Sequence, residues 1–151
     1  MMQAITIPSN TREEMIDITA DVERCLGESG RSEGVCVLFT QHTTCGLTIN
    51  ENADPDVKSD MLGFLQRLIP QSPTTPSAEA AATPPRAGGE SFFKHSEGNS
   101  DAHIKSSLVG SSVTVPFEDG KLLLGRWQGV YLCEFDGPRE RKVVVRIMNV
   151  E

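Results

Sequence analysis

One apolar run constrains the fold of this chain more than any other feature. Residues 34–41 read Gly-Val-Cys-Val-Leu-Phe-Thr-Gln, so apolar side chains would lie on both faces of a strand formed there. A strand at the surface normally alternates apolar with polar side chains, whereas a continuous short run is typical of a buried one. The run therefore predicts a central, buried strand around which the rest of the chain packs.

Shorter patterns predict the other elements and their order. Strands are expected over residues 3–8, 14–18, 45–50, 112–117, 121–124, 128–135 and 142–148. Helices are expected from a cap at Thr19 to about Glu28, from Pro55 to Pro70, and from a cap at Ser100 or Asp101 to about Leu108. This order favours an α+β fold with a mostly antiparallel sheet and a few helices.

Three local signals sharpen these expectations. Asp54 is predicted to cap the middle helix, with Pro55 at its first position, and Asp119-Gly120 to form a hairpin turn. In the middle helix, apolar side chains recur at helical spacing and predict one buried face: Val57, Met61, Phe64, Leu65 and Leu68. Trp127, the only tryptophan, is expected to fill the core.

The length of 151 residues predicts a single domain over residues 1–151. Residues 70–91 hold five of the nine prolines, together with many small and polar residues. Such a composition does not nucleate a packed element, so the segment is predicted to be a flexible surface loop within the domain.

Charge and cysteine usage narrow the classes of partner. The net charge is −7 and no basic run is present, which argues against nucleic acid or an anionic membrane as a partner. No cysteine pair has metal-binding C-x-x-C spacing, and Cys36 and Cys133 lie in apolar runs expected to be buried. Without a recognisable signal peptide or a run of membrane-spanning length, a cytoplasmic location is expected.

The three histidines are the main candidates for chemistry. His42, His95 and His103 each lie at the end of a predicted element rather than inside an apolar run. Histidine is the commonest metal ligand and the usual acid or base near neutral pH, so a shared site is one hypothesis. Three unrelated surface histidines are the alternative, and spacing alone leaves both open.

The segment 95–103 is the densest polar cluster in the chain. It carries His95, Glu97, Asn99, Asp101 and His103. Two histidines with a carboxylate suit a divalent metal such as zinc or magnesium, whereas a helix N-terminus beside histidines suits a phosphate. A flexible loop followed by a capped helix is the third interpretation.

Other polar groups end neighbouring elements. Thr43 and Thr44 are suited to an oxyanion or to an ordinary turn, and Arg139 to a phosphate. Glu51 has no capping role, which makes it a functional candidate, and Glu134 ends a predicted strand.

Three stretches together resemble the YjbQ family, whose members are also described as secondary thiamine-phosphate synthase-type proteins. The stretches are QHTTCGLTINENADPDV, HSEGNSDAHIKSSLVGSSVTVP and DGKLLLGRWQGVYLCEFDGPRERKVVV, and with the first strands they cover nearly the whole chain except residues 70–91. The chain departs from the family in a longer proline-rich loop directly before His95, where it is placed to cover the pocket, and at Cys45.

The resemblance implies an α+β fold, a homotrimer and a polar pocket near subunit contacts that takes a small phosphorylated metabolite. The residues that it assigns to the pocket are His42, Thr43, Asn50, Glu51, His95, Asn99, Asp101, His103, Gln128, Glu134 and Arg139. We expect His95, His103, Glu51 and Glu134 to be catalytic. We expect substrate contacts from His42, Thr43, Thr44, Asn50, Asn99, Asp101, Gln128 and Arg139, and metal ligation by His42, His95 and His103.

Three functions remain open at this point. Some members of the family support weak thiamine-phosphate synthase activity, in which a pyrimidine pyrophosphate is coupled to a thiazole phosphate. A metal-dependent hydrolase of a small phosphorylated or carbonyl substrate is a second enzymatic hypothesis. The third is a non-catalytic module that binds a small anion.

Overall fold

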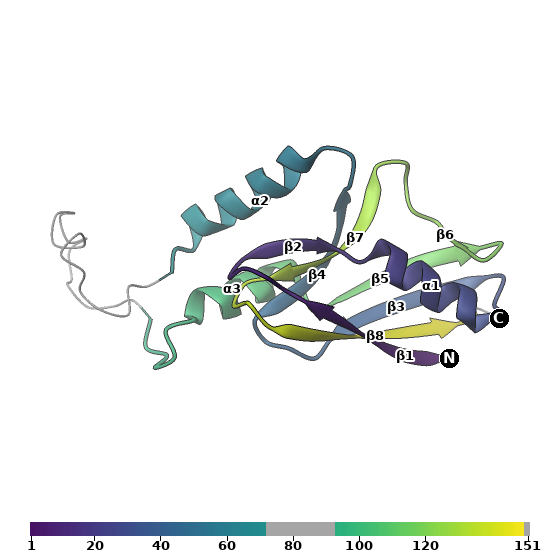
Figure 1. Cartoon of the computed structure of the whole chain (residues 1–151), viewed down its shortest axis with the longest axis horizontal. Coiled ribbons are helices and arrows are strands. Elements are labelled where there is room, and N and C mark those ends of the chain that lie inside the picture. The colour runs from purple at the N-terminus through teal and green to yellow at the C-terminus, as the bar shows by residue number, and fades with distance from the viewer. Residues whose placement is uncertain (72–92, 150–151) are drawn as a thin grey trace, which may run out of the picture.

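The computed structural model describes residues 1–71 and 93–149, which form three helices and eight strands (Figure 1). The helices are α1 (Thr19–Ser29), α2 (Pro55–Leu68) and α3 (Ser100–Val109). The strands are β1 (Met2–Pro8), β2 (Glu14–Asp17), β3 (Gly34–Thr40), β4 (Cys45–Glu51), β5 (Ser112–Glu118), β6 (Lys121–Leu122), β7 (Gln128–Glu134) and β8 (Glu140–Met148). The predicted α+β class is confirmed. The proline-rich segment lies outside the described residues, apart from Pro70 and Gln71.

The strands form two sheets in which every pair is antiparallel. The larger sheet has the order β1-β8-β3-β5-β6, and the smaller one has the order β2-β7-β4. The predicted central strand is therefore an interior strand of the larger sheet. Its burial alternates, however, because Cys36 and Leu38 are fully buried whereas Phe39 is 43% exposed. Only one face of β3 packs into the core, so the prediction of two buried faces was wrong.

The main core lies between the two sheets. Its side chains come from α1, from the inner face of β1, β3, β5 and β8, and from β4 and β7. A second, smaller cluster covers the other face of the smaller sheet and joins Met15, Tyr131, Cys133 and Phe135 to Ala102 of α3. The smaller sheet is therefore packed on both faces, and this leaves its strand ends as the places where polar groups collect.

Local sequence signals explain several boundaries. The Asp54 carboxylate accepts a hydrogen bond from the Asp56 amide at 2.9 Å, and Pro55 begins α2, as predicted. Asp119 and Gly120 both have positive φ, which confirms the turn between β5 and β6. The cap of α1 differs from the prediction: Thr19 is already helical, and its backbone amide donates to the carboxylate of Asp17.

The apolar face of α2 is only partly buried, which corrects the prediction from its spacing. No residue of α2 is fully buried, and Phe64 and Leu68 are 58% and 57% exposed. In Figure 1 the helix runs beside the smaller sheet and projects away from it. The periodicity correctly gave a helix with one apolar face. Met61 and Leu65 of that face pack against the second cluster, but no described residue of the chain buries Phe64 or Leu68.

Trp127 also differs from its prediction, since it is 53% exposed rather than part of the core. The guanidinium of Arg126 lies over the indole ring, 4.6 Å from its centroid. A cation over an aromatic face is a favourable arrangement that does not require burial.

All four cysteines are free and buried. Burial raises the pKa of the Cys36 thiol to about 11 and that of Cys133 to about 12. Cys36 and Cys133 are core residues, as predicted. None of the described helices combines the length and apolar character that a membrane crossing requires.

Candidate functional site

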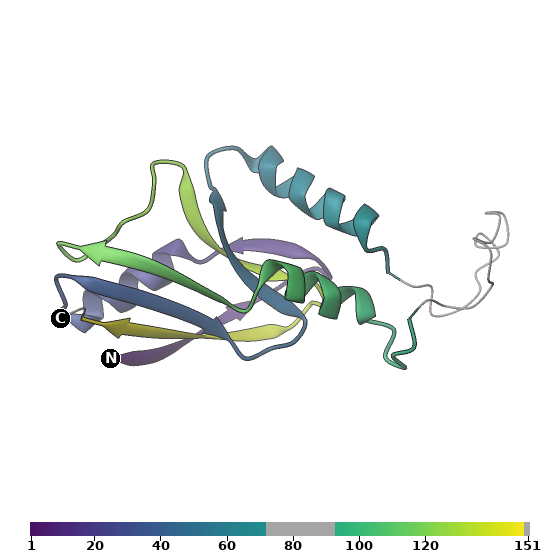
Figure 2. The same cartoon turned by 180° about the vertical axis from the view of Figure 1, so that it is seen from behind.

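One end of the smaller sheet gathers most of the predicted polar residues. Cys45 at the start of β4 pairs with Glu134 at the end of β7, so the loop before β4 and the turn after β7 meet there. The helix α3 packs beside β4 at the same end (Figure 2). Three segments distant in the sequence thus converge: residues 41–44, residues 97–106 and residues 134–141.

A buried ion pair holds this end together. Glu134 is 0% exposed and accepts hydrogen bonds from Nε and Nη2 of Arg141, at 2.7 and 2.5 Å. The same carboxylate accepts from the Ser9 hydroxyl and from the backbone amides of Phe135 and Asp136. Burial by itself raises the pKa of Glu134, but the hydrogen bonds from Arg141 and the Asp136 amide outweigh it and lower that pKa below its ordinary value.

The hydrogen-bonding capacity of the Glu134 carboxylate is filled, so its role is structural. Both of its oxygens already accept hydrogen bonds, and no part of the residue reaches solvent. Arg141 extends the arrangement, because its Nη2 also donates to the Thr44 hydroxyl at 2.8 Å. The pair therefore fixes the loop before β4 relative to β7 and β8.

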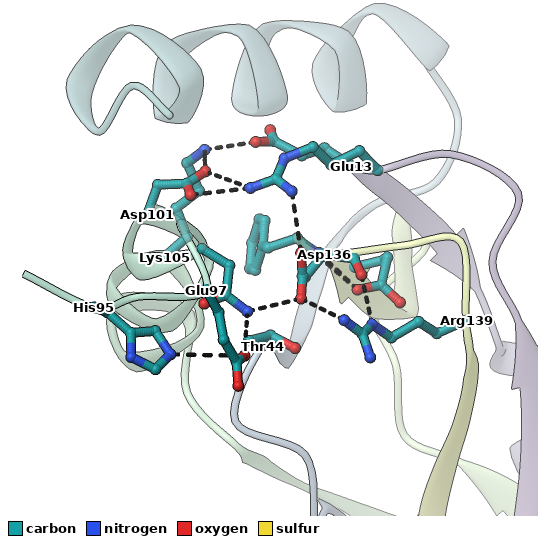
Figure 3. A network of polar contacts seen from close by, with 12 residues as sticks. Glu13, Thr44, His95, Glu97, Asp101, Lys105, Asp136 and Arg139 are labelled. Atoms are coloured by element: carbon teal, nitrogen blue, oxygen red, sulfur yellow. Dashed lines mark hydrogen bonds and ion pairs between the residues drawn. The ribbon is translucent and has the colours of Figure 1, made fainter. Parts of the chain in front are cut away.

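A second polar network surrounds Asp136 (Figure 3). Its carboxylate accepts from Arg12 at 3.0 Å, from Arg139 at 2.8 Å and from the Asn99 amide at 3.0 Å. Burial raises the pKa of Asp136, but the hydrogen bond from Asn99 and the charges of Arg139 and Arg12 bring it below its ordinary value. Asp136 thus stays ionised and holds Arg139 and Asn99 in place.

The network continues into α3. The ammonium of Lys105, 1% exposed, lies 2.6 Å from Glu13 and 3.2 Å from Asp101. Asp101 is fully buried and also contacts Arg12 at 3.0 Å. The predicted helix cap at Ser100 or Asp101 is therefore wrong: α3 begins at Ser100 with Asn99 at the cap position, and the Asp101 charge is committed to two cations. These contacts anchor the first turns of α3, which carry His103.

His42 and His103 line one hollow of about 270 Å³. The other residues around it are Gln41, Thr43, Thr44, Glu97, Asn99, Asp136, Arg139 and Arg141. His95 reaches the group from outside, with its ring at right angles to that of His103 and centroids 5.4 Å apart. Its Nε2 lies 3.7 Å from the Glu97 carboxylate. Two of the three histidines share this hollow, and the third contacts one of them.

His42 has a defined tautomer. Its Nε2 accepts a hydrogen bond from the backbone amide of Lys142 at 2.9 Å, which places the proton of the neutral ring on Nδ1. Burial and the nearby Arg141 charge lower the pKa of His42, which favours this neutral form. His42 therefore presents an N–H donor, whereas no described residue hydrogen-bonds the ring nitrogens of His103.

Three predicted site residues lie elsewhere. Glu51 pairs with Gln128 at the opposite end of β4 and β7, with Asn50 beside it. Glu51 lies six residue steps along β4 from Cys45, or roughly 20 Å. The side chains there have local partners: the Asn50 amide contacts the Met61 sulfur, and the Gln128 amide oxygen accepts from the Gly125 amide. Within one chain these residues do not share a site with the histidines.

Residue-type arguments missed Arg141 and Arg12. In β8 the buried positions alternate as Arg141, Val143, Val145 and Ile147. An arginine in phase with three core residues signals a buried charge with a partner, and this signal was present in the sequence. Arg12 follows no such pattern, because it lies in a loop and its own partners, Asp101 and Asp136, are distant in sequence.

Within residues 1–71 and 93–149, no three histidine, cysteine or acidic side chains form a cluster suited to a metal ion. His42 has already committed Nε2 to the Lys142 amide, and two guanidinium groups line the hollow. The residues of a single chain therefore do not fit the predicted three-histidine ligand set.

The buried pair gives a first prediction. Arg141→Met should lower the free energy of unfolding by about 3–5 kcal/mol, because it leaves the Glu134 charge buried without its partner. Arg146→Met, on an exposed position of the same strand, is the control and should change stability by less than about 0.5 kcal/mol. Urea denaturation of both variants measures the difference.

Acid titration adds a check with a defined sign. Because the folded pKa of Glu134 is lowered, the pair stabilises the wild type above the ordinary glutamate range and loses this contribution as pH falls through the folded pKa. Arg141→Met has no ion pair to lose in acid. The difference in free energy of unfolding between wild type and Arg141→Met should therefore narrow as the pH falls. A gap independent of pH would contradict the ionic role.

Comparison with known proteins points to the same family as the three sequence motifs. A family model described as UPF0047 protein YjbQ-like matches residues 3–150. The chain is 47% identical to a UPF0047 protein of Methanocaldococcus jannaschii over 149 residues, which cover 99% of this chain and 95% of the relative. It is 44% identical to the UPF0047 protein YugU of Bacillus subtilis, covering 99% of this chain and all of the relative.

Solved structures show the same fold. A crystal structure of a YjbQ/UPF0047 family protein from Clostridium acetobutylicum superimposes with a TM-score of 0.83 at 45% identity, covering 97% of this chain and 99% of the other. A YbjQ-like protein of unknown function from Sulfolobus solfataricus gives 0.80 at 27% identity, covering 99% and 97%. The chain therefore belongs to the YjbQ/UPF0047 family.

Proposed function

We propose that the hollow between His42 and Arg139 binds the phosphate group of a small metabolite. The observation that carries this proposal is a set of uncommitted donors around one small space. Arg139 uses Nε and Nη2 on Asp136, and Arg141 uses Nε and Nη2 on Glu134 and Thr44. Neither Nη1 has a hydrogen-bond partner among the described residues, although Arg141 is only 3% exposed.

Further donors point to the same chemistry. His42 offers Nδ1–H, and the Thr44 hydroxyl, which accepts from Arg141, keeps its own proton to donate. The carboxylates nearby offset the arginine charges, so recognition rests on fixed donors rather than on a large positive potential. Phosphate accepts several such hydrogen bonds at once, and charge-assisted bonds of this kind are the strong ones.

The reaction we propose first is that of a secondary thiamine-phosphate synthase, on the strength of the family resemblance and the donor set. The bond between the pyrimidine methylene carbon and the pyrophosphate oxygen breaks, and the oxygen leaves with the electron pair. The thiazole nitrogen forms the new bond to that carbon with its lone pair. Arg139, Arg141 and His42 would stabilise the charge that develops on the leaving pyrophosphate.

Metal binding stays a prediction, and no step is assigned to it. A divalent ion would neutralise pyrophosphate charge, but the described residues do not arrange the three predicted histidine ligands as a metal-binding cluster. Elemental analysis of protein purified without an affinity tag measures any zinc or magnesium bound.

We also propose a homotrimer, as the resemblance implies. Its support in this chain is the exposed part of the apolar face of α2, where Phe64 and Leu68 are more than half exposed. The separate group of Asn50, Glu51 and Gln128 lies at the opposite end of β4 and β7 from the histidines. A second copy is the means by which that group would reach a shared pocket.

Phosphate recognition predicts a matched pair of variants. Arg139→Gln should weaken pyrophosphate binding about tenfold or more, because a charge-assisted hydrogen bond is worth about 1.5–3 kcal/mol. Arg24→Gln is the control, since Arg24 and Arg139 are equally exposed, at 54% and 53%, and both pair with a nearby carboxylate. Calorimetric titration with pyrophosphate measures the affinity of both variants. Equal affinities of Arg139→Gln and Arg24→Gln would show that Arg139 is not part of the site.

The synthase proposal predicts thiamine phosphate from the purified protein and its two substrates. His103→Ala should abolish the product, because His103 carries the free imidazole in the hollow and is our candidate to donate a proton to the leaving pyrophosphate oxygen. The product is quantified by chromatography at high enzyme concentration. Pyrophosphate binding without product would reject the synthase and leave the hydrolase and the non-catalytic binding module as the remaining functions.

The trimer predicts a mass of three chains in light scattering. Phe64→Glu should shift the protein toward single chains, because it introduces a charge into the apolar face of α2. Asp60→Glu, an acidic substitution at an exposed position of the same helix, should leave the mass unchanged. A wild-type mass of one chain would contradict the proposal.

A further inference from the structure

The phosphate hollow has a larger neighbour. A second hollow of about 610 Å³ shares four lining residues with the first: Gln41, His42, Thr43 and His103. The two imidazoles therefore belong to the boundary between the hollows. A ligand that fills one can extend past both rings into the other.

The two hollows differ in charge. Two arginines and two acids line the first: Arg139, Arg141, Glu97 and Asp136. Among the described residues no lysine, arginine, aspartate or glutamate lines the second. Instead it presents the Phe39 ring, 43% exposed, and the hydroxyls of serines on α3 and before β5.

The serines on α3 are oriented by the backbone. Ser106 donates to the carbonyls of Thr43 and His103, and Ser107 donates to that of His103. Because their protons are committed, the hydroxyl oxygens remain as acceptors. A wall with an aromatic face and hydroxyl acceptors suits an uncharged ring that carries N–H or O–H donors.

From this segregation of charge we propose that the second hollow binds the uncharged, ring-sized body of the same ligand. The phosphate lies against Arg139, the ring against Phe39, and the bond joining them lies beside His42 and His103. This inference rests on the proposed phosphate site and adds the class of molecule: a phosphate ester of a neutral aromatic or heteroaromatic compound.

The two histidines then have different roles. Because Nε2 of His42 is held by the Lys142 amide, His42 is a fixed donor to the bridging or phosphate oxygen. His103, whose ring nitrogens have no hydrogen-bond partner in the described chain, is the group able to exchange a proton at the junction. The geometry thus places one positioning imidazole and one reactive imidazole at the boundary between the two hollows.

Calorimetric titration with inorganic phosphate and with phenyl phosphate tests the second hollow. Phenyl phosphate should bind about tenfold tighter or more, because the ring leaves water for an apolar surface. Phe39→Ala should remove this advantage without changing the affinity for inorganic phosphate. Phe39→Leu, which keeps the apolar volume without the ring, should lose part of it. Arg139→Gln should weaken both probes by the same factor.

Charge selectivity gives an independent readout. A phenyl phosphate with a para-carbamoyl group should bind tighter than its para-carboxylate counterpart, since only the second carries charge into the uncharged hollow. Unfolding transitions of the Phe39 variants check that they fold. If either fails to fold, the carbamoyl and carboxylate pair on the wild type decides.

The outcomes separate the two proposals. Equal affinity for phosphate and phenyl phosphate, or equal affinity for the carbamoyl and carboxylate esters, would overturn the second hollow and leave the phosphate site intact. Failure of every probe to bind would overturn the phosphate site and with it the inference. An equal loss of affinity for inorganic phosphate and phenyl phosphate in Phe39→Ala would place Phe39 in the phosphate site. It would contradict the assignment of phosphate and ring to separate hollows.

Discussion

The ion pair between Glu134 and Arg141 is the constraint on which the candidate site depends. It joins the last residue of β7 to an inward position of β8, and through Thr44 it also fixes the loop that carries His42. A buried pair gives little net stability compared with apolar packing, but removing one partner is costly. The pair therefore favours one arrangement of β7, β8 and the loop that carries His42. Arrangements that separate the two charges leave one of them buried without its partner.

The second network does the same for α3. Three carboxylates and three cations alternate from Glu13 through Lys105, Asp101, Arg12 and Asp136 to Arg139. Formal charges balance along this row, so burial of its inner members is tolerated. As a result the first turns of α3 are set by side chains from a loop near the N-terminus, and His103 lines the same hollow as His42.

Local chemistry made the strands, the Asp54 cap and the Asp119-Gly120 turn predictable, because each depends on neighbours in the sequence. The exposure of Phe64 and Trp127 was not predictable in this way, since periodicity reveals an apolar face but not what covers it. His42, Asn99, His103 and Arg139, which line one hollow, were predicted as candidates from residue type at element ends. The sequence did not reveal that Glu51 lies far from the histidines. Glu51 and His42 flank opposite ends of β4, and only the register of the sheet shows which strand ends meet.

The four unpaired thiols have a practical consequence. Each is buried, and in Cys36 and Cys133 the raised pKa leaves almost no thiolate at neutral pH. Alkylating reagents can reach them only when the surrounding layers separate, so the rate of modification at each sulfur reports how often that part of the molecule opens. Cys36 lies between the sheets and Cys133 in the cluster beside α3, which gives two natural probes for whether the layers open together or one at a time.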